Sequence, residues 1–294
     1  MLRDLLVSLR PEEWTKNLFV LAPLVFAGRL VDASSRARAG LVLVAFCLLA
    51  SSVYLSNDIA DLSADRLHPV KRRRPLPSGR ISVGMAGAAS VVLALLGLGL
   101  GFAIERDFPA VTGLLAGYLL LNLAYSFVLK HAVVVDALCV AGGFLLRIHA
   151  GGAAIGAEVS HWLSLCTLFV SLFLALAKRR AEISLLGEES SGHRAALAQY
   201  TPAFLDQLIG WLCACTILSY SIYTVSPETR EKFGTDRLWW TVPFVIYGVA
   251  RYLFLLHRRD GGGNPARTMV RDVPFLVNAA LWAAVAIGVI YRAR

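Results

Sequence analysis

Charged residues are scarce in this sequence of 294 residues. They make up 17% of the chain, against about 25% in a typical soluble domain, whereas 57% of the residues are hydrophobic. Most of the hydrophobic residues gather in long apolar runs, each close to the roughly 20 residues that a helix needs to cross a bilayer. This composition excludes an ordinary soluble domain and indicates a multi-pass membrane protein.

Several short motifs of metal and nucleotide sites are also missing. The five cysteines lie in apolar runs, and they form no CxxC or Cys/His pattern of the kind that holds zinc. The glycine run 261–263 is not followed by GK[ST], so it is not a phosphate loop. Because the basic residues are divided among short loops, we expect no nucleic-acid partner.

The apolar runs predict an all-α membrane protein of about nine transmembrane helices, forming a single domain over residues 1–294. The predicted spans are 17–31, 39–56, 83–104, 108–128, 133–156, 160–177, 203–225, 237–256 and 270–291. The first run lacks the small-residue cleavage site of a signal peptide, so we expect it to remain as a helix.

The distribution of Lys and Arg predicts the orientation in the membrane. With the N-terminus inside, 18 of the 29 basic residues fall in inner segments, which favours a cytoplasmic N-terminus in the cell membrane. The long polar loops 57–82, 178–202 and 257–270 then face the cytoplasm. The basic excess also suits contact with anionic membrane lipids.

An acidic cluster follows the second predicted span. Asp58, Asp61 and Asp65 continue an apolar helix and fall within about 60° of one another at 100° per residue. Carboxylates on one face repel one another, and they are costly at the edge of a bilayer. Magnesium would relieve both penalties, since it binds a few carboxylates and completes its shell with water and phosphate oxygens. The alternative is an interfacial loop with solvated acids.

A basic run comes next in the same loop. Lys71–Arg74 precedes Pro75, Pro77 and Gly79, which predict an irregular loop. The charges either bind phosphates or hold the loop inside. The neighbouring acidic cluster favours phosphate contact.

Together these two elements resemble the motifs of the UbiA superfamily of intramembrane prenyltransferases. The NDxxDxxxD motif is matched by Asn57, Asp58, Asp61 and Asp65, and the KxxRPL…G element by Lys71, Arg74, Pro75, Leu76 and Gly79. The resemblance covers most of the chain. It implies a helical bundle around a central cavity with a cytoplasmic cap, in which the three aspartates are catalytic and bind Mg²⁺.

One segment departs from the common pattern of the superfamily. A second acidic motif is expected after the sixth span, but residues 178–182 read KRRAE. With this basic segment the chain resembles the decaprenyl-phosphate phosphoribosyltransferase branch of the superfamily. The enzyme of that branch is also called 5-phosphoribosyl-1-monophosphodecaprenol synthase. Residues 10–17, 125–130, 136 and 142–147 agree with the same branch. The branch implies transfer of phosphoribosyl from phosphoribosyl pyrophosphate to a polyprenyl phosphate, a step toward cell-wall arabinan precursors.

The resemblance also implies a set of polar substrate contacts. They are Lys16, Asn17, Asn57, Lys71, Arg74, Tyr125, Lys130, Asp136, Arg147, Lys178, Arg179 and Glu182. Several of these residues have simpler explanations. Tyr125 and Lys130 suit interface anchors, Arg147 suits a buried structural pair, and the 178–180 run suits a topological anchor. Lys178 and Glu182 are i,i+4 neighbours, so the glutamate would orient the lysine or help to hold a metal.

Two alternatives stay open at this point. The first is a UbiA-type prenyltransferase with a polyprenyl diphosphate donor and an aromatic acceptor, which the missing second acidic motif disfavours. The second is a lipid or metabolite transporter, which would explain the spans but not the acidic cluster followed by a basic run. The isoprenoid length and a possible homo-oligomer are not specified by the sequence.

Overall fold

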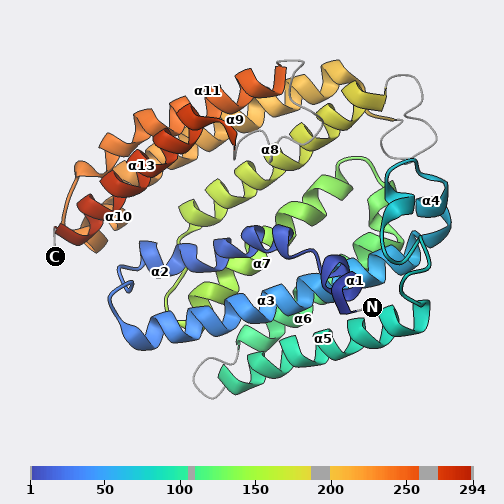
Figure 1. Ribbon diagram of the computed structural model, residues 1–294. Helices are drawn as coiled ribbons and strands as arrows, with labels where there is room; N and C mark the ends of the chain where they lie inside the picture. Colours follow the sequence, from blue (N-terminus) through green and yellow to red (C-terminus); the bar gives the residue numbers. More distant parts are fainter. Residues whose placement is uncertain (1, 105–109, 187–198, 258–270, 293–294) are drawn as a thin grey trace. The chain divides into compact units, whose positions relative to one another are not determined.

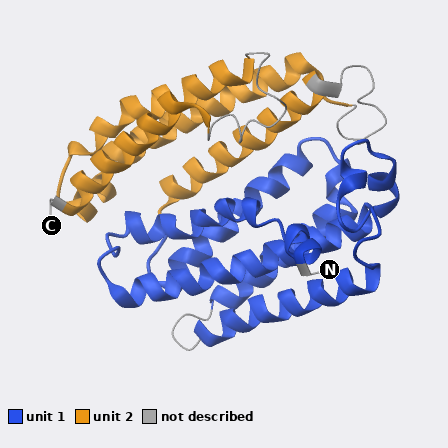
Figure 2. Cartoon of the chain, viewed as in Figure 1, with its two compact units in different colours: residues 1–159 blue, residues 160–294 orange. Residues whose placement is uncertain are grey.

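The computed structural model describes residues 2–104, 110–186, 199–257 and 271–292. Every regular element within these ranges is a helix (Figure 1). The chain divides into two compact units, residues 1–159 and 160–294 (Figure 2).

The first unit contains four long apolar helices. They are α3 (Ala33–Ala60), α5 (Val83–Ile104), α6 (Ala110–Phe127) and α7 (Val135–Ala154). All four are long and apolar enough to cross a membrane. Shorter elements join them: α4 (Leu62–Leu67), η2 (Lys71–Arg73) and η3 (Leu129–His131).

Helix α3 supplies much of the core of this unit. It begins at a capping residue, Asp32, whose carboxylate accepts hydrogen bonds from the backbone N–H groups of Ser34 and Ser35. Val42, Phe46 and Leu49 recur at helical spacing and are fully buried. Helix α5 packs closely against this face at Gly97, where a Cβ would lie 2.8 Å from the Leu49 side chain.

The first predicted span differs from the structure. Residues 17–31 do not form one long α-helix, because η1 (Pro11–Leu21) is a 3₁₀-helix and α2 (Ala22–Phe26) ends after five residues. Gly28 then takes a left-handed φ of 67°, which stops the helix. A short helix, α1 (Leu2–Ser8), precedes this segment. Helix α7 packs against η1 at Gly151, where any Cβ would collide with the carbonyl oxygen of Val20.

The second unit contains four further long helices. Its elements are α8 (His161–Leu186), α9 (Pro202–Val225), α10 (Pro227–Phe233), η6 (Arg237–Thr241), α11 (Val242–His257) and α13 (Val273–Arg292). The Tyr220 hydroxyl hydrogen-bonds Thr241 at 2.7 Å and accepts from Trp282 at 2.9 Å, which joins α9, η6 and α13. At the start of α13, two hydrogen bonds from Arg251 lower the pKa of Asp272.

In the described ranges, eight helices are long and apolar enough to cross a membrane. The predicted bounds match well where hydropathy alone sets them. The span predicted over 83–104 is α5, and the span predicted over 203–225 is α9 less its first residue. An all-helical, multi-pass membrane fold is therefore confirmed, and the count of nine was approximate.

Candidate active site

The acidic cluster lies where α3 ends. The helix stops at Ala60, and α4 starts at Leu62, so Asp61 is the one residue between them. Asp58 and Asp65 are buried, with 3% and 2% of their surface exposed, and the Asp61 side chain is 27% exposed. The three carboxylates therefore do not share one uninterrupted helical face. Asp61, at the interruption between the two helices, is the most exposed of the three.

The predicted basic loop contacts the two buried carboxylates. Arg74 Nη1 lies 3.2 Å from Asp58 Oδ1 and 2.9 Å from Asp65 Oδ2, so one guanidinium bridges both acids. Lys71 Nζ lies 3.5 Å from the second oxygen of Asp65. Pro75 directly follows Arg74 and is buried, which fixes the loop against the unit. The acidic segment and the basic loop thus lie together, and the metal and phosphate contacts predicted for them stay predictions.

Arg10 is a member of this site that the sequence analysis did not assign. Its Nη2 donates to Asp58 Oδ1, the oxygen that Arg74 also contacts. The guanidinium also lies over the Tyr54 ring, 4.8 Å from its centroid. Arg10 adopts a left-handed backbone (φ 53°), which is uncommon outside glycine and is compatible with a functional constraint. One feature of the sequence could have indicated a role for Arg10: it is the first residue of the 10–17 segment, which agrees with the phosphoribosyltransferase branch.

Ser51 of α3 helps to hold the segment that carries Arg10. Trp14 Nε1 donates to Ser51 Oγ at 3.0 Å, and Ser51 Oγ donates to the Leu9 carbonyl at 3.0 Å. Because Ser51 lies two helical turns before Asp58 on α3, these bonds hold Arg10 beside the carboxylate.

The third carboxylate has its own basic partner. Lys130 Nζ lies 2.5 Å from Asp61 Oδ1, although 69 residues separate the two in sequence. Lys130 belongs to η3, between α6 and α7, and its side chain is only 13% exposed. The fold thus places four basic side chains (Arg10, Lys71, Arg74 and Lys130) against three carboxylates. The cluster carries a formal charge of +1.

In the second unit, the predicted residues lie near the end of α8. Arg179 is buried, and its Nη1 lies 3.3 Å from Glu182 Oε2. The sequence analysis expected Glu182 to orient Lys178, and the structure shows an ion pair of Glu182 with the adjacent Arg179. Lys178 itself is exposed. The neighbouring Arg180 donates from Nε to Asp206 Oδ1 of α9 at 2.9 Å. Asp206 is an acid that the sequence analysis did not single out.

Comparison with known proteins decides the family. The profile of the UbiA prenyltransferase family matches residues 18–183, which is more than half of the chain. The chain belongs to the UbiA prenyltransferase family. Membership in this enzyme family disfavours the transporter alternative.

Relatives and solved structures agree with this assignment. Decaprenyl-phosphate phosphoribosyltransferases from Corynebacterium glutamicum and Mycolicibacterium smegmatis are 37% and 33% identical to the chain. The first alignment covers 94% of this chain and 83% of the relative, and the second covers 92% and 87%. A UbiA homolog from Archaeoglobus fulgidus, solved with GPP and Mg²⁺, has a TM-score of 0.72 at 21% identity. It covers 98% of this chain and 99% of its own, and it shows the same fold.

The oxygen donors of this UbiA-family site suit a hard divalent cation. Carboxylates from Asp58, Asp61 and Asp65 are the ligand type that Mg²⁺ prefers. Asn57 adds an amide oxygen, and this buried Oδ1 has no hydrogen-bond partner among the described residues. In the same ranges no three His, Cys, Asp or Glu side chains are grouped as a ready ligand set. Guanidinium and ammonium groups lie against the carboxylates instead. The donor set therefore fits Mg²⁺ once basic side chains move aside.

Two other predicted contacts, Asn17 and Arg147, bind each other instead. Arg147 Nε donates to Asn17 Oδ1 at 2.8 Å, and its Nη atoms donate to the Gly143 carbonyl at 2.9 Å and the Tyr118 hydroxyl at 3.0 Å. Arg147 is 6% exposed and Asn17 is fully buried. Asn17 also donates to Cys47, which lies about 16 Å along α3 from Asp58 at 1.5 Å per residue. The pair is thus distant from the acidic cluster.

The remaining predicted contacts occupy varied positions in the first unit. Lys16 forms an ion pair with Glu13 one turn earlier in η1. Tyr125 is half-buried near the end of α6. Asp136 is 2% exposed in the first turn of α7, where its Oδ1 accepts from the Ala137 N–H at 2.8 Å. That bond satisfies one of the open backbone donors of the helix start.

Proposed function

We propose that this chain transfers a 5-phosphoribosyl group from phosphoribosyl pyrophosphate to a polyprenyl phosphate such as decaprenyl phosphate, and releases pyrophosphate. The relatives named for this activity align over more than nine-tenths of the chain. The observation that carries the proposal is the excess of cations at the end of α3, where four basic side chains face three carboxylates. A donor with a diphosphate on C1 and a phosphate on C5 needs such an excess, because each phosphate is best held by charge-assisted hydrogen bonds.

The site residues divide into two groups by charge. Asp58, Asp61 and Asp65, with the Asn57 amide oxygen, would hold Mg²⁺, which when bound supplies positive charge to the departing pyrophosphate. Arg10, Lys71, Arg74 and Lys130 would bind phosphate oxygens directly. The carboxylates orient these cations, since every one of the four is within ion-pair distance of an aspartate.

The proposed reaction needs charge stabilisation more than proton transfer. The bond between C1 and the pyrophosphate oxygen breaks, and its electron pair leaves with pyrophosphate while C1 gains oxocarbenium character. Arg10 and Arg74 stabilise the negative charge that develops on the leaving group. A lone pair of the lipid phosphate then forms the new C1–O bond on the opposite face, which inverts C1. The second pKa of a phosphate monoester is about 6, so this nucleophile is largely ionised at pH 7 and needs no general base.

The basic segment at the end of α8 has a separate proposed role in holding the donor. Lys178 and Arg179 add positive charge in the second unit, and Glu182 fixes Arg179 through their ion pair. A segment with paired acids would repel a donor that carries an additional phosphate, whereas a cationic one attracts it.

We further propose that the N-terminus and the acidic cluster face the cytoplasm of a cell membrane, where a water-soluble sugar phosphate is available. Cysteine labelling in intact cells tests this orientation. Ser63→Cys, exposed beside the cluster, should react only after the membrane is opened, and Glu231→Cys, exposed on α10, should react from outside. The reverse pattern would refute the orientation.

The function itself is tested by product formation. The purified chain is incubated in detergent with labelled phosphoribosyl pyrophosphate, Mg²⁺ and decaprenyl phosphate, and a labelled lipid is expected. Omission of the lipid, or chelation of Mg²⁺, should abolish the product. If the chain instead joins a polyprenyl diphosphate to an aromatic acid and ignores phosphoribosyl pyrophosphate, the proposed substrate class is wrong although the family assignment stands.

A further inference from the structure

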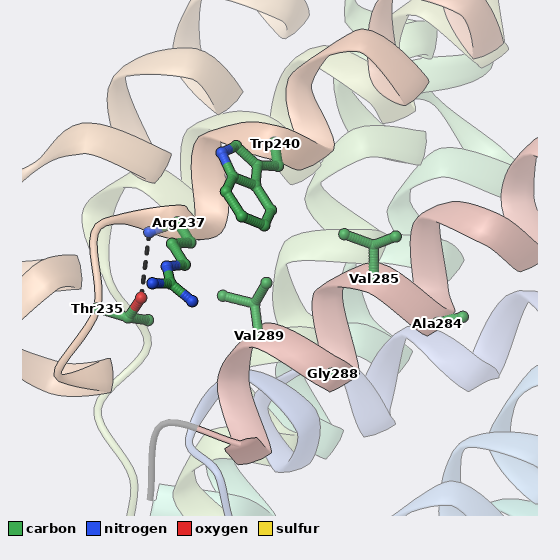
Figure 3. Close-up of a pocket in the computed structure, with 7 residues that line it drawn as sticks. All are labelled: Thr235, Arg237, Trp240, Ala284, Val285, Gly288 and Val289. Carbon is green, nitrogen blue, oxygen red and sulfur yellow. Dashed lines mark hydrogen bonds between the residues drawn. The ribbon is translucent and has the colours of Figure 1, made fainter.

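A pocket in the second unit is unrelated to the residues of the candidate active site. It lies between η6 and the last turns of α13 and encloses about 510 Å³ (Figure 3). Its lining residues are Thr235, Arg237, Trp240, Ala284, Val285, Gly288 and Val289. Arg237 is the one charged residue among these seven, and four of the others form an apolar wall.

The polar end of the pocket is the Arg237 guanidinium. In Figure 3 this side chain extends from its loop toward Val289, while its own backbone N–H donates to Thr235 Oγ1 at 3.2 Å. The guanidinium lies 5.6 Å from the centroid of the Trp240 ring. No carboxylate in the described ranges lies within ion-pair distance of Arg237. Arg237 is exposed, so its guanidinium is open to donate a charge-assisted hydrogen bond to an anionic group at this end of the pocket.

The opposite wall suits a hydrocarbon chain. Ala284, Val285, Gly288 and Val289 recur at i, i+1, i+4 and i+5, so they share one face of α13. The small side chains at Ala284 and Gly288 leave a groove on that face, and a Cβ added at Gly288 would meet nothing within 4 Å. These residues belong to the span Val273–Tyr291, so the groove runs from the end of the span toward its middle.

The order of these groups along the span matches the order of groups in a phospholipid. Val289 is two residues from the end of the span, and beside it lie Arg237 and Trp240, residue types common at the membrane interface. Beyond Arg237, a second hollow of about 560 Å³ is lined by polar groups that include Arg230 and Asp236. A phosphate on Arg237 would thus place a polar headgroup in this hollow and an acyl chain along α13.

We propose that this pocket binds one anionic phospholipid, with its phosphate on Arg237 and an acyl chain against the groove of α13. Negative headgroups are favoured over zwitterionic ones because no carboxylate of the described residues pairs with Arg237. Trp240, with 49% of its surface exposed, covers the boundary between headgroup and chain.

Native mass spectrometry of the full chain in detergent tests this proposal, with phosphatidylglycerol and phosphatidylcholine titrated separately. Arg237→Gln should weaken phosphatidylglycerol binding about tenfold or more, since it removes a charge-assisted contact. Gly288→Leu should weaken binding of both lipids by filling the groove. Matched controls are Lys232→Gln, which removes the same charge from neighbouring α10, and Gly210→Leu, which adds the same bulk at another open glycine. Both controls should bind like the wild type.

Several outcomes would overturn the proposal. If the wild type binds phosphatidylglycerol and phosphatidylcholine with equal affinity, the positive charge of Arg237 does not select an anionic headgroup. If Arg237→Gln weakens binding but Gly288→Leu does not, or if inorganic phosphate displaces the lipid, the site takes a free anion. If the variants change the oligomeric mass and leave the number of bound lipids unchanged, the pocket is a protein interface. Should Gly288→Leu fail to fold, Ala284→Leu narrows the same groove and gives the same test.

Discussion

Replacement of Arg10 by glutamine separates the proposed donor site from a merely structural ion-pair cluster. Arg10 shares Asp58 Oδ1 with Arg74, so Asp58 keeps a cation at 3.2 Å when Arg10 is neutralised. Removing the only partner of a buried charge costs about 3–5 kcal/mol. Here a partner remains, and the Arg10 side chain is 20% exposed, so we expect a loss of stability nearer 1–2 kcal/mol. The variant should therefore fold.

The expected effect on activity is larger than the effect on stability. A hydrogen bond to a charged group contributes about 1.5–3 kcal/mol, which corresponds to roughly ten- to 150-fold in kcat/KM. Because Arg10 is proposed to bind the donor, the KM for phosphoribosyl pyrophosphate should rise or kcat should fall, while the KM for decaprenyl phosphate changes little. Steady-state kinetics in detergent, with each substrate varied in turn, measures this split.

The control is Arg80→Gln. Arg80 is a basic residue of the same loop region, but it pairs with Asp4 at 2.7 Å and its side chain is 51% exposed. This variant should keep donor kinetics within about twofold, since an exposed ion pair contributes about 0–1 kcal/mol. A double variant of Arg10 and Asp58 adds a further check. If Arg10 acts only by pairing with Asp58, the double variant will equal Asp58→Asn alone.

Wild-type donor kinetics in folded Arg10→Gln would exclude Arg10 from the donor site. An equal loss of activity in Arg80→Gln would exclude it too, because the effect would then reflect general charge and not the position of Arg10.

Three further predictions concern other parts of the chain. Asp58→Asn should remove most activity in a folded protein and should weaken Mg²⁺ binding, which isothermal titration measures; near-normal turnover at ordinary Mg²⁺ would contradict the site. Lys178→Ala should raise the KM for phosphoribosyl pyrophosphate about tenfold or more and spare that for decaprenyl phosphate, whereas Lys232→Ala should change neither. Arg147→Met should lower Tm without a selective effect on either KM, because it leaves Asn17 Oδ1 and the Tyr118 hydroxyl without their donor at about 1–3 kcal/mol each. A Tm equal to the wild type's, with a raised KM, would instead make Arg147 a substrate contact.

The long helices could be predicted because bilayer thickness imposes a length and a polarity that hydropathy reads directly. For residues 17–31 hydropathy predicted one long helix that the structure does not have, and the reason is local. This segment is apolar, but Pro23 lies in the first turn of a short helix that begins at Ala22, and Gly28 permits the left-handed turn that ends it. Mean hydropathy over a window of residues does not detect either effect, because each depends on the backbone conformation of a single residue.

The acidic and basic halves of the site could also be predicted, since they are close in sequence. Arg74 reaches both Asp58 and Asp65 across at most 16 residues. The pairing of Asp61 with Lys130 could not be derived from spacing, because it depends on how α6 and η3 return to the end of α3. The interruption of the helix at Asp61 was also missed, since no glycine or proline marks it.

A buried arginine in the fifth span was expected to have a partner, and that prediction is confirmed. The partners themselves were beyond sequence reasoning. Arg147 is satisfied by the neutral oxygens of Asn17, Gly143 and Tyr118, and not by a carboxylate. Charge patterns give no signal for such contacts, because an amide, a carbonyl and a phenol all occur throughout apolar helices.

The arrangement at the end of α3 also constrains how the proposed ligands bind. Asp58 and Asp65 are buried, and Arg10 and Arg74 neutralise them. A metal ion that replaced these guanidinium groups alone would leave Arg10 and Arg74, which are 20% and 34% exposed, without an anion. A phosphate that took the guanidinium groups alone would strand the carboxylates in the same way. If metal and pyrophosphate bound together, Asp58 and Asp65 would each exchange a guanidinium for the metal, and Arg10 and Arg74 would each exchange a carboxylate for phosphate. The number of neutralised charges is then preserved, so the site should favour the metal–pyrophosphate pair over either ligand by itself.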